Sequence, residues 1–257
     1  MTNYRALDPA KIIATLDQLE RRIEARFPGA GLVKLSHEVA DTARAASANA
    51  ADIAAPSWRH RLFGAAAIAL GVLVLGYIAF NLDYRKSVDS IFTVLQGIDS
   101  AFNIIVLMGA SSLFVMRQEE IDKRNRALKH LHELRSLIHI IDMHQLTKDP
   151  SVTTLPGPPT VASPKRLLSP FELSRYLDYC SEMLSLTAKI AALYAQSSRD
   201  SVVISTVNEL EALAANLSEK IWQKIGMLHK EIAPPLPVQI VPSAQAPAAP
   251  AAAKPAT

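Results

Sequence analysis

The sequence is poor in several residue types that other protein classes depend on. Its 257 residues include 9 glycines, 6% aromatic residues and one cysteine, Cys180. Sparse glycine argues against a glycine-rich nucleotide-binding fold, and the low aromatic content fits poorly with a β-sandwich. A single cysteine excludes an intramolecular disulfide framework and is typical of a reducing compartment. A net charge of +3 is too small and too dispersed to indicate nucleic acid binding.

Motifs that carry chemistry are also missing from the sequence. There is no Walker loop, no GxGxxG, no CxxC pair and no nucleophile elbow. Cys180 falls at a core position of a heptad-like stripe, where a buried thiol is usually inert. We therefore expect no enzymatic activity, no cofactor and no metal.

An uncharged apolar run is the first strong feature that is present. It reads LFGAAAIALGVLVLGYIAFNL, residues 62–82. At about 1.5 Å per residue it spans roughly 31 Å, which matches the hydrocarbon core of a bilayer. Trp58 on one side, and Tyr77 with Tyr84 on the other, resemble an interfacial aromatic belt. The run predicts a first transmembrane helix.

A second apolar run, AFNIIVLMGASSLFVM, is only 16 residues long. The preceding SIFTVLQGIDS extends it back towards Ser90, which predicts a second span over residues 91–116. Two arginines precede the first span and five cations follow the second, whereas the connection holds only Arg85 and Lys86, offset by aspartates. The positive-inside rule therefore predicts two cytoplasmic termini and a short external hairpin.

The rest of the patterned sequence predicts amphipathic helices. Asp8-Pro9 is a helix-start signal, and two apolar stripes separated by PGAG predict an αα-hairpin. The alanine-rich stretch that ends at Pro56 is either a weakly amphipathic helix or a linker. Ser169 to Glu172, SPFE, is a capping box with proline at the first helical position. It starts the first of two heptad-like helices that a short turn joins into an antiparallel hairpin.

The fold class expected from these patterns is an all-α membrane protein with two transmembrane helices and cytoplasmic helical hairpins. No proline or glycine falls between Arg117 and Lys148, so the second span is expected to continue as a cytoplasmic stalk helix. A three-helix bundle of the stalk and the C-terminal hairpin is the economical way to bury their apolar faces. The expected segments are an N-terminal cytoplasmic hairpin (1–55), two transmembrane helices (62–82 and 91–116) with a short external loop (83–90), the stalk (117–148), a Pro-rich loop (149–168), the antiparallel hairpin (169–230) and a disordered Pro/Ala-rich tail (231–257).

The stretch KHLHELRSLIHIIDMHQLTKDP, residues 129–150, crowds four histidines together. On a helix no two of them have the i, i+3 or i, i+4 spacing that lets two side chains hold one ion. A metal site on this helix alone is therefore excluded. Arg135, His139 and Asp142 project away from the apolar stripe as a candidate polar contact of the stalk. They form a solvated face or bundle contact, a proton-sensitive contact, or a metal site completed by another helix.

Asp99 and Asn103 are the candidate polar residues of the second span, with Gln96 one turn earlier. Intramembrane polar groups are expensive unless they are paired or hydrated. The pair marks an ion path or an interhelical contact, or else Gln96 and Asp99 lie in the outer headgroups and only Asn103 lies inside. Small residues in both spans, including Gly71 and Gly109, favour close packing of the two spans, within one chain or across protomers.

Two resemblances accompany these patterns. HELRSLIHIIDMHQLTKDP, SPFELSRYLDYCSEMLSL and KIWQKI resemble a group of uncharacterised bacterial two-span inner-membrane proteins over most of Arg117 to Ile225. That resemblance implies no activity. RQEEIDKRNRALKHLHEL is similar, over about 18 residues, to the segment that follows a span in low-affinity iron-permease-like proteins. The rest of that family's pattern is not evident, and the similarity implies transport as an alternative.

The expected function is that of a non-enzymatic, two-span protein of the bacterial inner (plasma) membrane. Its cytoplasmic helices are expected to mediate self-association, as a homo-oligomer, or to bind a protein partner. The lipid bilayer is its expected surroundings, and nucleic acid is not an expected partner. The alternative is a small ion transporter or channel subunit, which depends on Asp99, Asn103 and the short second span.

Overall fold

The structure, a computed structural model, describes residues 5–55, 58–81, 91–150, 161 and 168–232. Within these residues all regular secondary structure is α-helical, which confirms the all-α prediction. The external loop expected at 83–90, most of the Pro-rich loop and nearly all of the tail lie outside the described residues. The six helices are α1 (Pro9–Arg26), α2 (Gly31–Ala54), α3 (Trp58–Asn81), α5 (Ile91–Leu146), α7 (Pro170–Ser197) and α8 (Ser201–Ile232).

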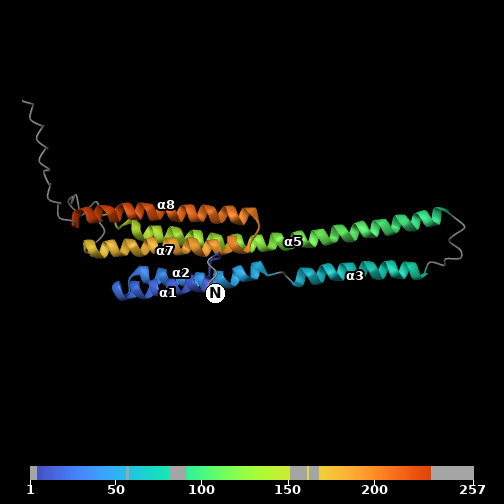
Figure 1. The fold of residues 1–257 in the computed structure, drawn as a ribbon, viewed down its shortest axis with the longest axis horizontal. Coiled ribbons are helices and arrows are strands. Elements are labelled where there is room, and N and C mark those ends of the chain that lie inside the picture. Colours follow the sequence, from blue (N-terminus) through green and yellow to red (C-terminus); the bar gives the residue numbers. More distant parts are fainter. Residues whose placement is uncertain (1–4, 56–57, 82–90, 151–160, 162–167, 233–257) are drawn as a thin grey trace, which may run out of the picture.

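The helices form a long rod with two different ends (Figure 1). At one end α3 and the first half of α5 lie side by side as a pair. At the other end α1, α2, the second half of α5, α7 and α8 form a bundle. The 56 residues of α5 run through both ends without a break, over about 84 Å at 1.5 Å per residue. The predicted continuity of the second apolar run with the stalk is therefore confirmed.

The bundle is built around α7. This helix packs against α1, α2, α5 and α8, and its side chains contribute to one continuous apolar core. The fully buried residues of α7 cover more than one face: Leu177, Cys180 and Leu184 lie on the expected stripe, and Met183 and Ile190 lie beside it. Because α7 is apolar over so much of its circumference, two partner helices cannot cover it. The core therefore includes the N-terminal hairpin, and the three-helix bundle predicted from the sequence was too small.

The N-terminal hairpin joins this core through small side chains. Asp8 caps α1 by accepting a hydrogen bond from the Ala10 amide at 3.0 Å, and Gly29 turns the chain with a φ of +71°. The alanine-rich stretch is helical up to Ala54, so the linker alternative is excluded. Its alanines at positions 40, 43, 46 and 50 are buried, which lets α2 approach its neighbours closely.

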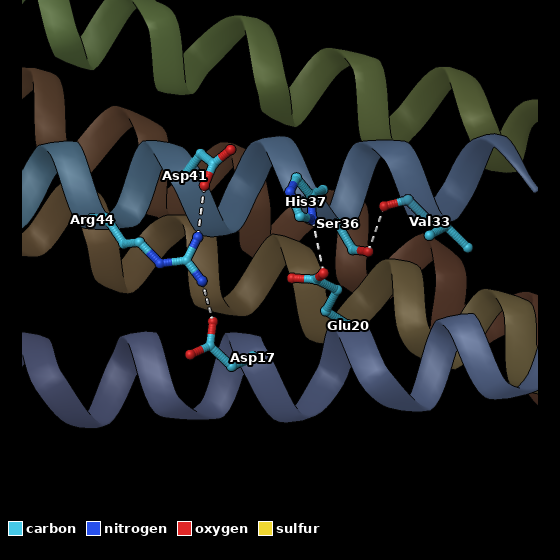
Figure 2. A network of polar contacts seen from close by, with 7 residues as sticks. All are labelled: Asp17, Glu20, Val33, Ser36, His37, Asp41 and Arg44. Carbon is cyan, nitrogen blue, oxygen red and sulfur yellow. Dashed lines mark hydrogen bonds and ion pairs between the residues drawn. The ribbon is translucent and has the colours of Figure 1, made fainter. Parts of the chain in front are cut away.

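Polar contacts tie the outer sides of α1 and α2 together (Figure 2). The guanidinium of Arg44 donates to Asp41 on its own helix and to Asp17 on α1, both at 2.6 Å. About two turns before Arg44 on α2, His37 pairs with Glu20 at 2.8 Å, and this hydrogen bond raises the pKa of the imidazole. Exposed pairs of this kind contribute little energy each.

The C-terminal hairpin begins at the predicted capping box. The Ser169 hydroxyl accepts from the Glu172 amide at 3.3 Å, and the Glu172 carboxylate accepts from the Ser169 amide at 2.8 Å. At the turn, Asp200 accepts from the amides of Val202 and Val203 and so caps α8. The capping box predicted at Ser169 and Glu172 is confirmed.

Candidate functional site

The pair formed by α3 and the first half of α5 differs from the bundle in having its large apolar side chains on the outside. Among the described residues, one helical run is long and apolar enough to cross a membrane. It is Leu95–Leu146 of α5, and no part of its most apolar window is buried. The run in α3, Leu62–Tyr77, is shorter. The exposed large apolar residues of the pair include Phe63, Leu73, Tyr77 and Phe80 of α3 and Phe92, Ile98, Phe102, Leu107, Leu113 and Phe114 of α5.

The two helices of the pair touch along one line. The half-buried side chains of this part of α5 are spaced three or four residues apart, at Ala101, Ile104, Met108, Ser112 and Val115. Gly71 of α3 lies against Met108: a β-carbon placed on Gly71 would meet the Met108 sulfur and its neighbouring carbons. The glycine predicted to permit close packing is therefore at a contact between α3 and α5.

Asp99 and Asn103 lie on the other side of α5. Both side chains are exposed, and the Asn103 amide donates to the Asp99 carboxyl at 3.4 Å. At about 100° per residue, Asp99 projects about 180° from Met108, which faces α3. The structure thus brings these two predicted site residues together and points them away from the rest of the described chain.

The junction between the pair and the bundle is held by cations from the group that follows the second apolar run and that predicts its orientation in the membrane. The Lys123 ammonium donates to the Ala55 carbonyl at 2.7 Å, at the C-terminal end of α2. Arg126 pairs with Asp52 of α2 at 2.9 Å, and Arg124 lies 3.7 Å from Asp200 at the start of α8. A cation at a helix C-terminus is favoured by the helix dipole. These contacts connect α5 to α2 and α8 where it enters the bundle.

The three polar residues predicted as a contact of the stalk, Arg135, His139 and Asp142, do not form one group in the structure. The Arg135 guanidinium donates to Glu209 of α8 at 2.8 Å. Asp142 accepts from the Gln145 amide at 2.6 Å, and His139 is exposed. Arg135 is thus a contact within the bundle, and Asp142 belongs to a separate polar group.

That polar group, which the sequence analysis missed, is centred on Gln145. Gln145 is only 3% exposed and lies one residue before the C-terminal end of α5. The Lys224 ammonium donates to Gln145 Oε1 at 2.5 Å while Gln145 donates to Asp142. No sequence motif marks the group, because its members come from two helices 79 residues apart.

The four histidines of the stretch separate as helical geometry predicts. The ring of His130 stacks on Tyr194 with centroids 6.1 Å apart, and His132 is exposed like His139. His144 lies 3.3 Å from the Tyr176 hydroxyl, and burial, with nearby Lys148, lowers the pKa of its imidazole. In the parts of the chain that the structure describes, no group of three or more His, Cys, Asp or Glu could hold a metal ion.

Burial also accounts for the state of Cys180. It raises the pKa of this thiol to about 12, so the group stays protonated and unreactive at neutral pH.

An open groove of about 620 Å³ lies between α1 and α7. Its lining includes the arginines at positions 22, 26 and 175 and the rings of Phe171 and Tyr179. Two of these arginines are already paired: Arg22 donates to Glu182, and Arg175 donates to Asp178 at 3.2 Å. Arg26 instead stacks over Phe171. The groove is a mixed polar and aromatic surface of the bundle and presents no nucleophile beside a base.

Comparison with known proteins adds no further assignment. No family model, curated protein or solved structure matches the chain.

Proposed function

We propose that this chain is a two-span integral protein of the bacterial inner membrane whose helical bundle lies in the cytoplasm. The bundle would serve in self-association or in binding a protein partner, without catalysis. The observation that carries the proposal is the contrast between the two ends of the rod. The bundle buries its apolar side chains in one core, whereas α3 and the first half of α5 expose theirs on every side that they do not share.

An apolar surface that extends over both helices is unfavourable in water. Monomeric soluble proteins rarely expose contiguous apolar patches above a few hundred Å². In a bilayer the same surface meets lipid, and the helical backbone satisfies its own polar groups. The charge pattern supports the orientation, since cations gather where α5 enters the bundle. The described sides of the bundle also carry exposed Trp222 and Met143, residue types that are enriched at protein interfaces.

Membrane insertion is tested on the full chain in bacterial membranes. Alkaline carbonate extraction should leave the protein in the membrane pellet. For topology, Ser87→Cys in the expected external loop should react with an impermeant maleimide in intact cells. The matched variant Ser205→Cys, at an exposed position on α8, should react only after the membrane is permeabilised. Extraction of the protein by carbonate, or the reverse labelling pattern, would contradict the proposal.

The partner role is tested by crosslinking in native membranes and identification of the captured chains. Trp222→Ala should reduce capture of a partner that uses the bundle. An exposed alanine variant on another helix, Lys11→Ala on α1, is the comparison.

A small ion transporter or channel subunit is the second candidate. Its support is the hydrogen-bonded pair of Asp99 and Asn103 in an otherwise apolar helix. The pair faces away from α3, so an ion path along it would need helices from further chains. Replacing Asp99 with alanine and Asn103 with leucine should abolish ion flux into liposomes if the pair lines a path. Unchanged flux would remove this candidate.

A further inference from the structure

The face of α5 opposite α3 carries Asp99 and Asn103. Most residues of this part of α5 that do not face α3 are exposed, and one line of them begins at Asp99 and advances by alternating steps of four and three residues. Its residues are Asp99, Asn103, Val106, Ala110, Leu113 and Arg117. At about 100° per residue these six positions project between about 140° and 220° from Met108, so they form one line on the helix. We call this line the α5 seam.

The spacing of the α5 seam, like that of any line along one helix face, is compatible with packing against another helix. Apolar stripes with a repeat of 3.5 residues pack against a partner at a crossing angle near 20°. The same four-and-three spacing places Leu173, Leu177, Cys180 and Leu184 of α7 in the bundle core. In the bundle such stripes are buried, whereas no described part of the chain covers the α5 seam. The seam is therefore an exposed line that no described residue of the same copy covers.

The polar residues of the seam indicate what that partner is. Asn103 donates one hydrogen bond to Asp99, but its amide has a second N–H and a carbonyl oxygen, and the carboxyl has a second oxygen. Hydrocarbon offers no partner for these atoms. A second α5 in the same orientation brings its own amide and carboxyl to the same depth, so donors and acceptors meet across a two-fold axis. A single asparagine in such a stripe is known to set register and the number of helices.

The apolar part of the seam is compatible with close approach. Ala110 lies two turns after Asn103 and presents only a methyl group. Small residues at this kind of position let two transmembrane helices come near each other. Arg117 ends the seam where α5 leaves the apolar region for the bundle.

We propose that a second copy of this chain packs its α5 against the α5 seam, with Asn103 and Asp99 of the two copies hydrogen-bonded at the interface. This inference rests on the proposed membrane insertion. It places a self-association surface on the first half of α5, in addition to any such surface on the bundle. The interface is isologous, so each copy contributes the same residues.

The test is oxidative crosslinking of the full chain in native membranes. Val106→Cys places a thiol on the seam, and Ile105→Cys places one at almost the same depth about 100° away. Val106→Cys should give a disulfide-linked dimer. Ile105→Cys, and the natural chain with only buried Cys180, should not.

A second variant tests the hydrogen bonds. Asn103→Leu in the Val106→Cys chain should lower the dimer yield roughly threefold or more, as expected for loss of interhelical hydrogen bonds in a membrane. Ser111→Ala is the matched control, because that hydroxyl donates to the Leu107 carbonyl of its own helix and lies off the seam. It should leave the yield unchanged.

The outcomes separate this inference from the proposed function. If carbonate removes the protein from the membrane, both are wrong. If the protein stays in the membrane but Val106→Cys gives no dimer, gives no more than Ile105→Cys, or links only to a different protein, the seam is not a self-association surface. Membrane insertion then stands. An unchanged yield with Asn103→Leu would overturn the role of the polar pair.

Discussion

At two glycines the absence of a side chain allows two helices to approach closely. Gly71 meets Met108 between α3 and α5, and Gly31 meets the ring of His144 at the start of α2, where a β-carbon would lie 2.9 Å from the ring. Glycines elsewhere in the same helices meet nothing: Gly64 and Gly76 of α3 have no neighbour within 4 Å of an added β-carbon. Helical glycines in this chain therefore differ in importance although they look alike in sequence.

Replacing Gly71 with leucine is expected to separate α3 from α5. The new side chain must displace Met108, and overpacking of this kind typically costs about 1–3 kcal/mol. Thermal unfolding in mild detergent should show the loss. Gly76→Leu gains the same helix propensity without meeting a neighbour, so it should unfold at or above the temperature of the natural chain. Equal loss in both variants would contradict the contact.

His144 is expected to make the bundle less stable in acid. Its pKa in the folded protein lies below the ordinary value of 6.5, because burial and nearby Lys148 disfavour the charged form. The unfolded chain therefore binds more protons between the folded pKa and 6.5, and the free energy of unfolding falls as pH falls through that range. Chemical unfolding followed at several pH values measures this slope, and His144→Gln should reduce it.

His37 supplies the comparison of opposite sign. Its pKa is raised by the hydrogen bond to Glu20, so its contribution to stability is present below pH 6.5 and is lost as pH rises through the folded pKa. His37→Gln should therefore remove a stabilising contribution at low pH. The assignment to His144 would be wrong if both variants changed the slope in the same direction.

At the scale of elements, local signals in the sequence set where helices begin. Asp8, Ser169 and Asp200 each accept from backbone amides at a helix start. These bonds satisfy donors that have no partner inside the helix. Loss of one cap is therefore expected to lower the free energy of unfolding through these unsatisfied amides, without a change in core packing.

Ser169→Ala is expected to destabilise the bundle by about 1 kcal/mol, the usual value for loss of an N-cap. The change removes the acceptor of the Glu172 amide and one of the donors to the Glu172 carboxylate. Thermal or urea unfolding of the full chain in detergent measures the effect. Ser205→Ala, at an exposed position inside α8, is the control and should be neutral or slightly stabilising.

At the scale of the whole molecule, α5 connects the two ends and α7 organises the bundle. Because α7 has buried side chains on its faces toward α1, α2, α5 and α8, no hairpin of the bundle is complete alone. The N-terminal hairpin is thus part of the bundle, although two apolar runs separate it from the rest in sequence.

A fragment of residues 117–230 is therefore expected to fold incompletely. Without α1 and α2, the side of α7 that packs against them loses its cover, including Tyr176 and Tyr179, whose rings contact Phe27 edge-on. The fragment should expose apolar surface and bind a hydrophobic dye. Adding a separate fragment of residues 1–55 should restore the native near-ultraviolet spectrum and abolish the dye binding. A fragment 117–230 that is compact and unfolds cooperatively on its own would show that the hairpin is dispensable.

Several features of the fold can be predicted from the sequence by itself. Helix starts follow from short signals such as Asp8-Pro9 and SPFE, because a cap involves neighbours in the chain. The continuation of α5 into the bundle follows from the lack of proline and glycine between Arg117 and Lys148. The dispersal of the four histidines follows from helical geometry alone. Residues 62–82 and 91–116 are marked as apolar by composition.

What only the tertiary structure decided depends on contacts between distant segments. Periodicity shows that a helix has an apolar stripe but not which helices cover it, so the share of the core held by α1 and α2 was missed. The buried group of Gln145 and Lys224 joins residues 79 positions apart and leaves no local signal. Asp99 and Asn103 were identified from the sequence as polar residues in an apolar helix. Only the position of α3 in the structure shows that these two side chains face away from it. The sequence does not show which side of α5 contacts α3.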